Sequence, residues 1–220
     1  MTVPIYKLTL LGDAYVGKTA ILVQYFCENW VPDYEPTVED SLRKAPCIDG
    51  TPVLLEIFDT AGTEQYSSVA NQLDAETDGY IIVYSITSRK SFNVLPALYD
   101  QLITLKGTKN LKIVIAGNKC DLNEERQVST AEGQELAKRW GSNCAFFETS
   151  AKKRINCEDV FIQIVRIIAA NRKLSTNQNK MHLLIVVKFC KNNNKFSIKF
   201  EISSTLKRYN LVCYITIYFL

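Results

Sequence analysis

Histidine is almost absent from this 220-residue chain, and its cysteines lack the spacing of a metal or disulfide framework. His182 is the single histidine, and the seven cysteines include no C-x-x-C pair. These two facts indicate neither a zinc site nor a disulfide scaffold. The chain also has no room for a signal peptide before an apolar segment begins at residue 5. We therefore expect a reducing, cytoplasmic setting.

The first 173 residues lack an excess of positive charge, with 19 Lys and Arg against 22 Asp and Glu. Such a mildly acidic globule offers no basic face for nucleic acid. Residues 174–220 differ, with 7 basic residues against 1 acidic residue. Residues 181–220 contain no glycine, proline, alanine or aspartate, and 27 of these 40 residues are Leu, Ile, Lys, Asn, Phe, Tyr or Met. A/T-rich codons favour that set.

This composition predicts a folded domain at residues 1–173 and a basic tail at residues 174–220. Our hypothesis is that the tail is disordered or is translated non-coding sequence. The alternative is a peripheral membrane contact, in which residues 183–187 and 211–220 meet lipid and the lysines meet anionic headgroups. Both apolar runs are too short to span a bilayer.

A glycine loop lies between an apolar run at residues 5–11 and a helical pattern at residues 19–26. The loop has the spacing G-x-x-x-x-G-K-[ST], from Gly12 to Thr19. Glycines at these positions let the backbone turn tightly, so that successive N–H groups point at a phosphate. Lys18 would reach the terminal phosphates, and the Thr19 hydroxyl would ligate a bridging Mg²⁺. The pattern therefore predicts a nucleoside triphosphate as ligand.

Strands and helices alternate along the rest of the domain. Residues 43–48 and 52–59 form a predicted hairpin around Asp49-Gly50, the one antiparallel pair. Further strands are expected at residues 79–85, 111–117 and 144–148, and helices at residues 91–106, 130–140 and 157–172. This order predicts an α/β fold of the P-loop nucleotide-binding class, with a mostly parallel six-stranded sheet, one antiparallel edge strand and helices on both faces.

Polar motifs follow three of the predicted strands, where open parallel sheets bind their ligands. Asp59-Thr60-Ala61-Gly62 follows the hairpin, Asn118-Lys119-Cys120-Asp121 follows residues 111–117, and Thr149-Ser150-Ala151-Lys152 follows residues 144–148. Asp121 discriminates between bases, because a carboxylate accepts hydrogen bonds and guanine offers two adjacent donors where adenine does not. The sequence therefore favours guanine, and argues against an ATP-using enzyme.

With the glycine loop and these three motifs in order, residues 4–172 resemble the small GTPases of the Ras superfamily. The resemblance implies that the enzyme hydrolyses GTP to GDP with Mg²⁺, which Thr19, Thr37 and Asp59 would hold. The catalytic residues that it implies are Lys18, Thr37, Gly62 and Thr63. The nucleotide-binding residues that it implies are Gly12, Asp13, Ala14, Tyr15, Val16, Gly17, Lys18, Thr19, Ala20, Trp30, Tyr34, Thr37, Asp59, Gly62, Asn118, Lys119, Asp121, Ser150, Ala151 and Lys152.

Within the superfamily, residues 34–44 and 59–66 look most like the Ras and Rap branch, and Thr63 in the DTAGTEQ motif is Rap-like. The matching residue is usually a glutamine that orients the attacking water. The partners implied are an exchange factor, a GTPase-activating protein of Rap type, and an effector with a Ras-binding type of domain that pairs at residues 37–44. Glu39 and Asp40 would face a basic partner strand.

Two positions depart from the family pattern. Ala14 and Tyr15 stand where Ras and Rap proteins usually have two glycines, so hydrolysis is expected to be slow. The alternative function is a GTP-loaded effector-binding module with negligible hydrolysis. The final four residues are Ile-Tyr-Phe-Leu, without the cysteine of a prenylation box. We expect a cytoplasmic protein, placed on the cytoplasmic face of a membrane only if its native C-terminus carries a lipid anchor.

Overall fold

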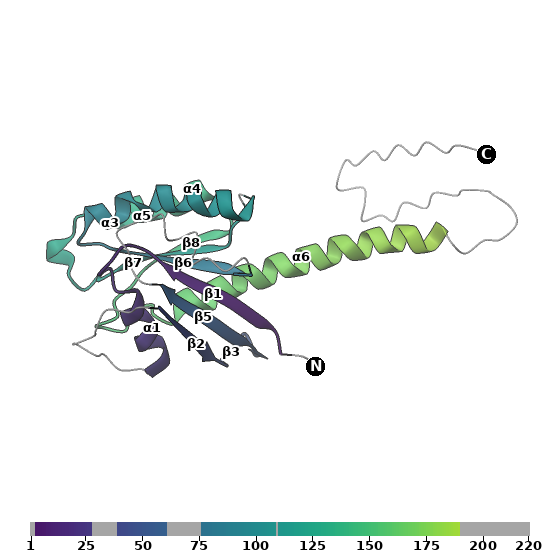
Figure 1. The fold of residues 1–220 in the computed structure, drawn as a ribbon, viewed down its shortest axis with the longest axis horizontal. Coiled ribbons are helices and arrows are strands. Elements are labelled where there is room, and N and C mark those ends of the chain that lie inside the picture. Colours follow the sequence, from purple (N-terminus) through teal and green to yellow (C-terminus); the bar gives the residue numbers. More distant parts are fainter. Residues whose placement is uncertain (1–2, 28–38, 61–75, 109, 190–220) are drawn as a thin grey trace, which may run out of the picture. The chain divides into compact units, whose positions relative to one another are not determined.

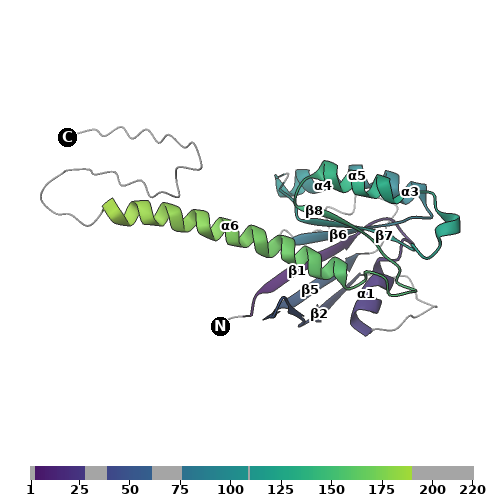
Figure 2. The same cartoon turned by 180° about the vertical axis from the view of Figure 1, so that it is seen from behind.

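A computed structural model describes residues 3–27, 39–60, 76–108 and 110–189, with side chains for all of these except 39, 40 and 175–189. The chain divides into two compact units, Met1–Ser175 and Thr176–Leu220. Figures 1 and 2 show the elements of the first unit from two sides. In chain order the described elements are β1 (Ile5–Leu11), α1 (Lys18–Cys27), β2 (Glu39–Lys44), β3 (Cys47–Ile48), β4 (Thr51–Pro52), β5 (Leu54–Thr60), β6 (Gly79–Ser85), α3 (Arg89–Asn93), α4 (Leu95–Lys106), β7 (Ile113–Asn118), η2 (Asn123–Glu125), α5 (Thr130–Trp140), β8 (Cys144–Glu148) and α6 (Asp159–Phe189).

Six strands form one mixed sheet in the order β2-β5-β1-β6-β7-β8. Every neighbouring pair is parallel except β2 with β5, so the antiparallel strand lies at an edge. Every residue of β6 and β7 is buried, which is typical of parallel strands covered on both faces. The predicted α/β fold, with its mostly parallel six-stranded sheet, is confirmed.

The edge hairpin has the predicted direction but is divided into two ladders. β2 pairs with β5, and β3 pairs with β4 around the predicted turn, both in one register. Between the ladders the Val53 N–H donates to the Pro46 carbonyl at 3.0 Å. The predicted antiparallel hairpin over residues 43–48 and 52–59 is confirmed, with different bounds for its strands. Pairing begins earlier, at Glu39, and is interrupted where Pro46 has no N–H to donate.

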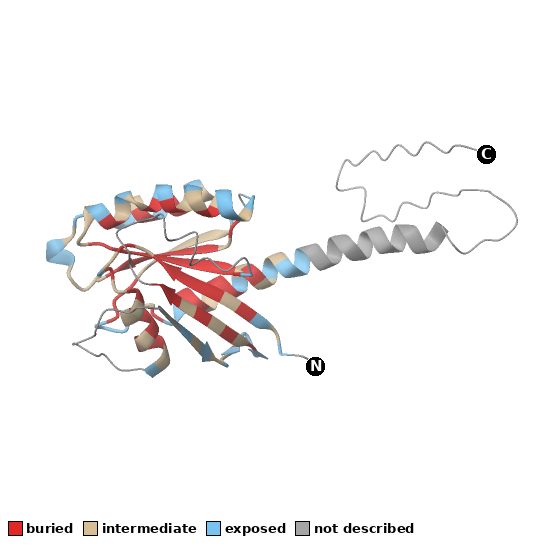
Figure 3. Cartoon of the chain, in the orientation of Figure 1, coloured by how far each residue is buried: buried red, intermediate tan, exposed pale blue. Residues whose placement is uncertain are grey.

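Helices cover both faces of the sheet (Figures 1 and 2). Side chains of α1 and of the first part of α6, such as Ile21 and Phe161, share one hydrophobic core with β1 and β5. Side chains of α4 and α5, such as Leu98 and Leu136, share a second core with β6 and β7. Figure 3 shows the central strands as the most buried part of the chain. The two cores fix the carboxyl ends of the parallel strands, where the predicted motifs lie.

The helix predicted over residues 91–106 is two helices, α3 and α4, which meet at Val94. Pro96 lies in the first turn of α4. Proline has no N–H for the helical ladder, and its ring clashes with the carbonyl four residues earlier, at Phe92. The first turn of a helix tolerates proline, so a new helix begins there.

The last helix is longer than the sequence pattern indicated. We predicted residues 157–172, whereas α6 is Asp159–Phe189. Residues 173–189 contain no glycine or proline, so no helix breaker marks the predicted end. Residues 174–189 thus belong to α6, and residues 190–220 lie outside the described residues. The domain boundary at residue 173 stays a prediction. Among the helices that the structure describes, none has the length and apolar character of a membrane span.

Candidate functional site

The loop between β1 and α1 is built around two glycines whose conformations other residues rarely adopt. Gly12 has a φ of 144° and Gly17 a φ of 94°. A Cβ on Gly12 would lie 2.1 Å from the Val83 carbonyl oxygen of β6, and one on Gly17 would lie 2.4 Å from Nδ2 of Asn118. The loop backbone therefore packs directly on the ends of β6 and β7, in a cradle that a Cβ would fill.

Lys18, the first residue of α1, is only 6% exposed. Its Nζ donates to the carbonyl oxygens of Gly12 and Asp13, each at 3.0 Å. Burial lowers the pKa of this ammonium, while the nearby carboxylates of Asp59 and Asp13 act in the opposite direction. A buried cation that is held by two loop carbonyls at a helix N-terminus suits an anionic ligand such as a phosphate.

Thr19 and Asp59 bring two oxygen ligands together from α1 and β5. The Thr19 hydroxyl donates to Oδ2 of Asp59, which is 2% exposed. A hydroxyl and a carboxylate beside a phosphate-binding loop are the donor set that Mg²⁺ prefers, because Mg²⁺ binds through a few protein oxygens and keeps phosphate and water as its other ligands. The residues present therefore fit the predicted magnesium site, of which Thr37, the third predicted ligand, lies outside the described residues.

Asn118 and Lys119 fasten the end of β7 to the glycine loop. Nδ2 of Asn118 donates to the Val16 carbonyl at 2.9 Å, and its Oδ1 accepts from the Thr149 hydroxyl at 3.2 Å. Nζ of Lys119 donates to the Tyr15 carbonyl at 2.9 Å. The two residues that we predicted to contact the base are thus used, in this structure, to join the base and phosphate halves of the site. Thr149, which takes part in this link, was not predicted as a site residue.

Asp121 lies beside Ser150, as the strand-end argument predicted. The Ser150 hydroxyl donates to Oδ1 of Asp121 at 2.6 Å. The second oxygen, Oδ2, has no hydrogen-bond partner among the described residues. Asp121 is half-buried, Ser150 and Ala151 are buried, and Lys152 is exposed. A carboxylate oriented from one side and open on the other can accept two adjacent N–H donors.

An ion pair between Arg126 and Glu148 stabilises the end of β8, directly before the segment that contains Ser150. Arg126 donates to both oxygens of Glu148, at 2.6 and 3.1 Å, and Thr130 donates to the same carboxylate at 2.9 Å. The Glu148 carbonyl accepts from Asn156 at 2.7 Å. Glu148 is the last residue of β8, directly before the Thr149-Ser150 segment, so the pair fixes where that segment leaves the sheet. Sequence reasoning missed this pair because its partners are 22 residues apart in different elements.

The remaining predicted residues of the loop have distinct environments. Val16 is buried, whereas Ala14 and Ala20 are partly exposed. Tyr15 is 87% exposed and has a φ of 60°, a left-handed conformation that is uncommon outside glycine and asparagine. The structure thus brings together the described members of the predicted site. The other predicted members, Trp30, Tyr34, Thr37, Gly62 and Thr63, lie outside the described residues.

Comparison with known proteins agrees with this geometry. The family model of the Ras family matches residues 7–170. Among curated proteins, the chain is similar to the Ras-like protein rasS of Dictyostelium discoideum, with 44% identity over 174 residues. The similarity covers 79% of this chain and 89% of the relative. The matched region contains the glycine loop, the Thr19–Asp59 pair and both base motifs.

Proposed function

The chain belongs to the Ras family of small GTPases, which hydrolyse GTP, and we propose that it is a Rap-like member of that family whose own hydrolysis is slow. It acts as a GTP-binding switch. The observation that carries the nucleotide assignment is the position of Asp121, which Ser150 orients beside a base motif that is bonded directly to the phosphate loop. These hydrogen bonds support the proposal that a guanine-selective carboxylate and a phosphate-binding loop lie at the same end of the sheet.

Guanine is recognised at Asp121 by two donors, the ring N1–H and the exocyclic amine. The half-buried Asp121 carboxylate would lose both charge-assisted bonds with a base that lacks these donors. Ser150, Ala151 and Lys152 close over the base carbonyl. Asn118 and Lys119 support this pocket through Val16 and Tyr15, and Trp30 covers the base from its edge.

The phosphates bind in the loop from Gly12 to Ala20, which includes Asp13, Ala14, Tyr15, Val16 and Gly17. Lys18 leaves its loop carbonyls to contact the β- and γ-phosphates. Thr19, Thr37 and, through water, Asp59 would hold the Mg²⁺, which would neutralise charge on the phosphates. Tyr34 closes over the phosphates, and the Gly62 N–H meets the γ-phosphate.

Slow hydrolysis is inferred from Thr63. A glutamine at this position accepts a hydrogen bond from the attacking water and orients it, whereas threonine is too short for this role. We infer that water is poorly oriented in this chain alone. The bound nucleotide therefore stays as GTP until a partner supplies the missing group.

Ala14 and Tyr15 affect that partner. The Ala14 methyl lies on the path by which an activating protein inserts a catalytic residue. Tyr15 places an exposed ring next to the same entrance, in a left-handed conformation that fixes its direction. An activating protein of Rap type, which inserts its own amide, therefore has to pass both side chains.

Two other partners follow from family membership, an exchange factor and an effector. Because β2 lies at the edge of the sheet, one side of its backbone is available to add a further strand. We propose that the effector pairs along residues 37–44. The setting that we propose is the cytoplasm, or the cytoplasmic face of a membrane if the native protein carries a lipid anchor.

A second candidate is a GTP-loaded module that binds its effector and barely hydrolyses. Thr63, Ala14 and Tyr15 together favour it. The two functions make the same predictions for binding and differ in rate, so hydrolysis decides between them.

Guanine specificity is tested with Asp121→Asn. We expect the GTP affinity to fall by roughly 3–6 kcal/mol, because two bonds to a charged group are lost at roughly 1.5–3 kcal/mol each. Titration calorimetry with GTP and ATP measures the change. The control is Asp100→Asn, which alters an exposed carboxylate on α4. GTP binding equal to that of the unchanged protein would refute the assignment of Asp121.

Hydrolysis is tested by single-turnover measurements on residues 1–173, alone and with Rap-type or Ras-type activating proteins. We expect an intrinsic rate no higher than that of Ras, a relative, which is about 3–5 × 10⁻⁴ s⁻¹. Thr63→Gln should raise the intrinsic rate, and Ala14→Gly should improve the response to the activating protein. An intrinsic rate above that of Ras would contradict both arguments.

A further inference from the structure

Gln24 is a buried polar residue in the middle of an apolar helix face. It is 4% exposed and lies on α1 among the buried residues Ile21, Leu22 and Tyr25. Its Nε2 donates to the Ala151 carbonyl at 2.8 Å, across 127 residues of sequence. Ala151 belongs to the segment that follows β8 and lies beside Asp121. The hydrogen bond therefore joins α1 directly to the base side of the candidate site.

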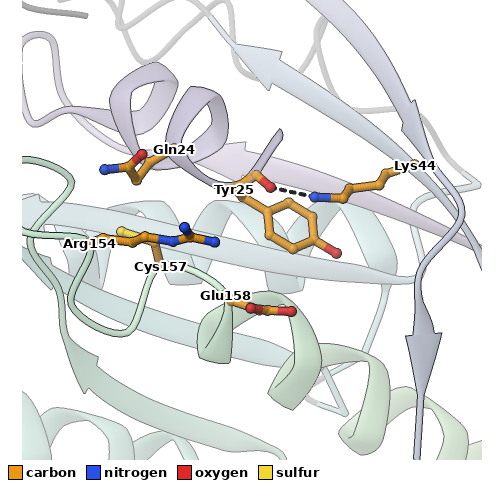
Figure 4. Close-up of a pocket in the computed structure, with 6 residues that line it drawn as sticks. All are labelled: Gln24, Tyr25, Lys44, Arg154, Cys157 and Glu158. Atoms are coloured by element: carbon orange, nitrogen blue, oxygen red, sulfur yellow. Dashed lines mark hydrogen bonds between the residues drawn. The ribbon is translucent and has the colours of Figure 1, made fainter. Parts of the chain in front are cut away.

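The environment of the Gln24 amide oxygen helps to explain why this position has an amide side chain. This oxygen, Oε1, is buried and has no hydrogen-bond partner among the described residues. Gln24 lines a cavity of about 20 Å³, which is shown in Figure 4. This cavity has room for about one water molecule. An apolar side chain of equal length would fill this place without an unsatisfied acceptor. The feature that favours an amide over an apolar side chain at this position is therefore its hydrogen bond to the Ala151 carbonyl.

α1 is a suitable anchor for such a bond because both of its ends are fixed. Its first two residues, Lys18 and Thr19, belong to the phosphate half of the site. Near its last turn the Tyr25 carbonyl accepts from Lys44 of β2, and the Tyr25 ring stacks on Phe161 of α6 with centroids 4.3 Å apart. Figure 4 shows Lys44 meeting this end of the helix. A displacement of Ala151 relative to α1 therefore changes the distance between the base and phosphate subsites.

We propose that Gln24 is a positioning residue that sets the segment Ser150–Lys152 over the base and thereby slows guanine-nucleotide release. The inference rests on the proposed function. Without the Gln24 donor, the buried Ala151 carbonyl loses its hydrogen bond to α1. The segment Ser150–Lys152 then moves so that this carbonyl can accept another hydrogen bond. Contacts to the base carbonyl weaken, while Lys18 keeps its hydrogen bonds to the carbonyls of Gly12 and Asp13, in which Gln24 takes no part.

The test uses the full chain with the variant Gln24→Met, which keeps the length and helix propensity of the side chain and removes its amide. Release of fluorescent GDP is measured with excess unlabelled GDP. We expect release about fivefold to tenfold faster than in the unchanged chain, as for the loss of one buried neutral hydrogen bond. Gln24→Asn retains the amide but is one methylene too short, so it should match Gln24→Met. The control is Gln101→Met on α4, and it should leave release unchanged. The Oε1 of Gln101 is also buried, with no hydrogen-bond partner in the part of the chain that the structure describes.

A second readout separates positioning from general loosening. Affinities for GDP and for 2-aminopurine riboside diphosphate, which lacks the base carbonyl and the ring N1–H, are compared by competition, and for each nucleotide the variant is compared with the unchanged chain. We expect Gln24→Met to weaken GDP and to leave the carbonyl-free nucleotide unaffected. Equal weakening of both nucleotides, or unchanged GDP release in both Gln24 variants, would overturn the inference. If the unchanged chain itself fails to retain GDP, the proposed function fails instead.

Discussion

Gly12 and Gly50 both have a positive φ, 144° and 74°, but only Gly12 lies against another strand. A Cβ on Gly50 would meet nothing within 4 Å, whereas one on Gly12 would lie 2.1 Å from the Val83 carbonyl. Comparing substitutions at the two glycines therefore distinguishes the energetic cost of backbone strain from the cost of a steric clash. They also show what the G-x-x-x-x-G-K-[ST] pattern leaves unstated, namely that its first glycine is required by β6 as well as by the ligand.

We predict that Gly12→Ala destabilises the fold by about 2 kcal/mol or more and abolishes tight GTP binding, because the loop must leave β6. Gly50→Ala should cost only about 1–2 kcal/mol, the usual penalty of a Cβ in the left-handed region, and should leave GTP binding intact. Urea denaturation gives the stabilities, and calorimetry gives the affinities. Equal losses in the two variants would mean that contact with Val83 does not matter.

At the scale of elements, local chemistry decided where predictions held. The helix predicted over residues 130–140 matches α5 because Ser129 and Glu132 form a capping box, a local signal. The break between α3 and α4 has an equally local cause in Pro96, but helical periodicity continues across it. The first strand of the edge hairpin was predicted too short. Its pairing at Glu39 depends on β5, and the hydrophobic periodicity of one segment gives no information about a partner strand. Gln24 was missed for the same reason, since its partner Ala151 is distant in sequence.

Glu132 makes α5 sensitive to acid. Arg89 donates to both of its oxygens, at 2.6 and 3.1 Å, and Ser129 donates through its N–H and its hydroxyl. Hydrogen bonding from Arg89, and then from Ser129, lowers the pKa of Glu132 to about 2 from its usual 4.5. A carboxyl whose pKa is lowered on folding contributes stability that is complete above pH 4.5 and is lost as the pH falls toward 2.

We predict that Glu132→Gln lowers the melting temperature at pH 7 and that this difference narrows as the pH falls below about 4.5. Thermal unfolding followed by circular dichroism from pH 7 to pH 3 measures it. Glu135→Gln, which changes an exposed carboxylate on the same helix, serves as the control. A difference between wild type and Glu132→Gln that stays constant across this range would show that the Arg89 contact does not stabilise the fold.

At the scale of the whole molecule, the motifs located the site because strand ends meet at one edge of a parallel sheet. Asp59 and Asn118 lie at the carboxyl ends of β5 and β7, and Ser150 follows β8. The order of the strands brings these three residues to the glycine loop. The sequence did not indicate how these motifs contact one another. Val16 and Tyr15 contribute backbone carbonyls, and Thr149 contributes a hydroxyl to a residue distant in sequence, so no side-chain pattern predicts these bonds. Nor did the sequence locate the end of α6, since residues 173–189 contain no breaker.

The end of the folded unit depends on what α6 contacts. Arg172 donates to the Ile5 carbonyl at 3.1 Å and to Asp78 at 2.7 Å, and its guanidinium lies 4.6 Å from the Tyr6 ring centroid. Ile168 is buried in the core, whereas Leu174 is 63% exposed. The contacts of the helix with the sheet therefore extend through Arg172, and the compact unit ends at Ser175.

We predict that residues 1–175 alone retain the GDP affinity and the melting temperature of the full chain. Residues 1–167, which lack both Ile168 and Arg172, should melt lower by several degrees, because a buried isoleucine and a three-partner arginine are lost at roughly 2–5 kcal/mol together. Scanning calorimetry and GDP titration on the three lengths compare them. A tenfold loss of GDP affinity on cutting after residue 175 would show that residues 176–220 stabilise the nucleotide site, since this cut leaves the contacts of Arg172 with Ile5, Tyr6 and Asp78 in place.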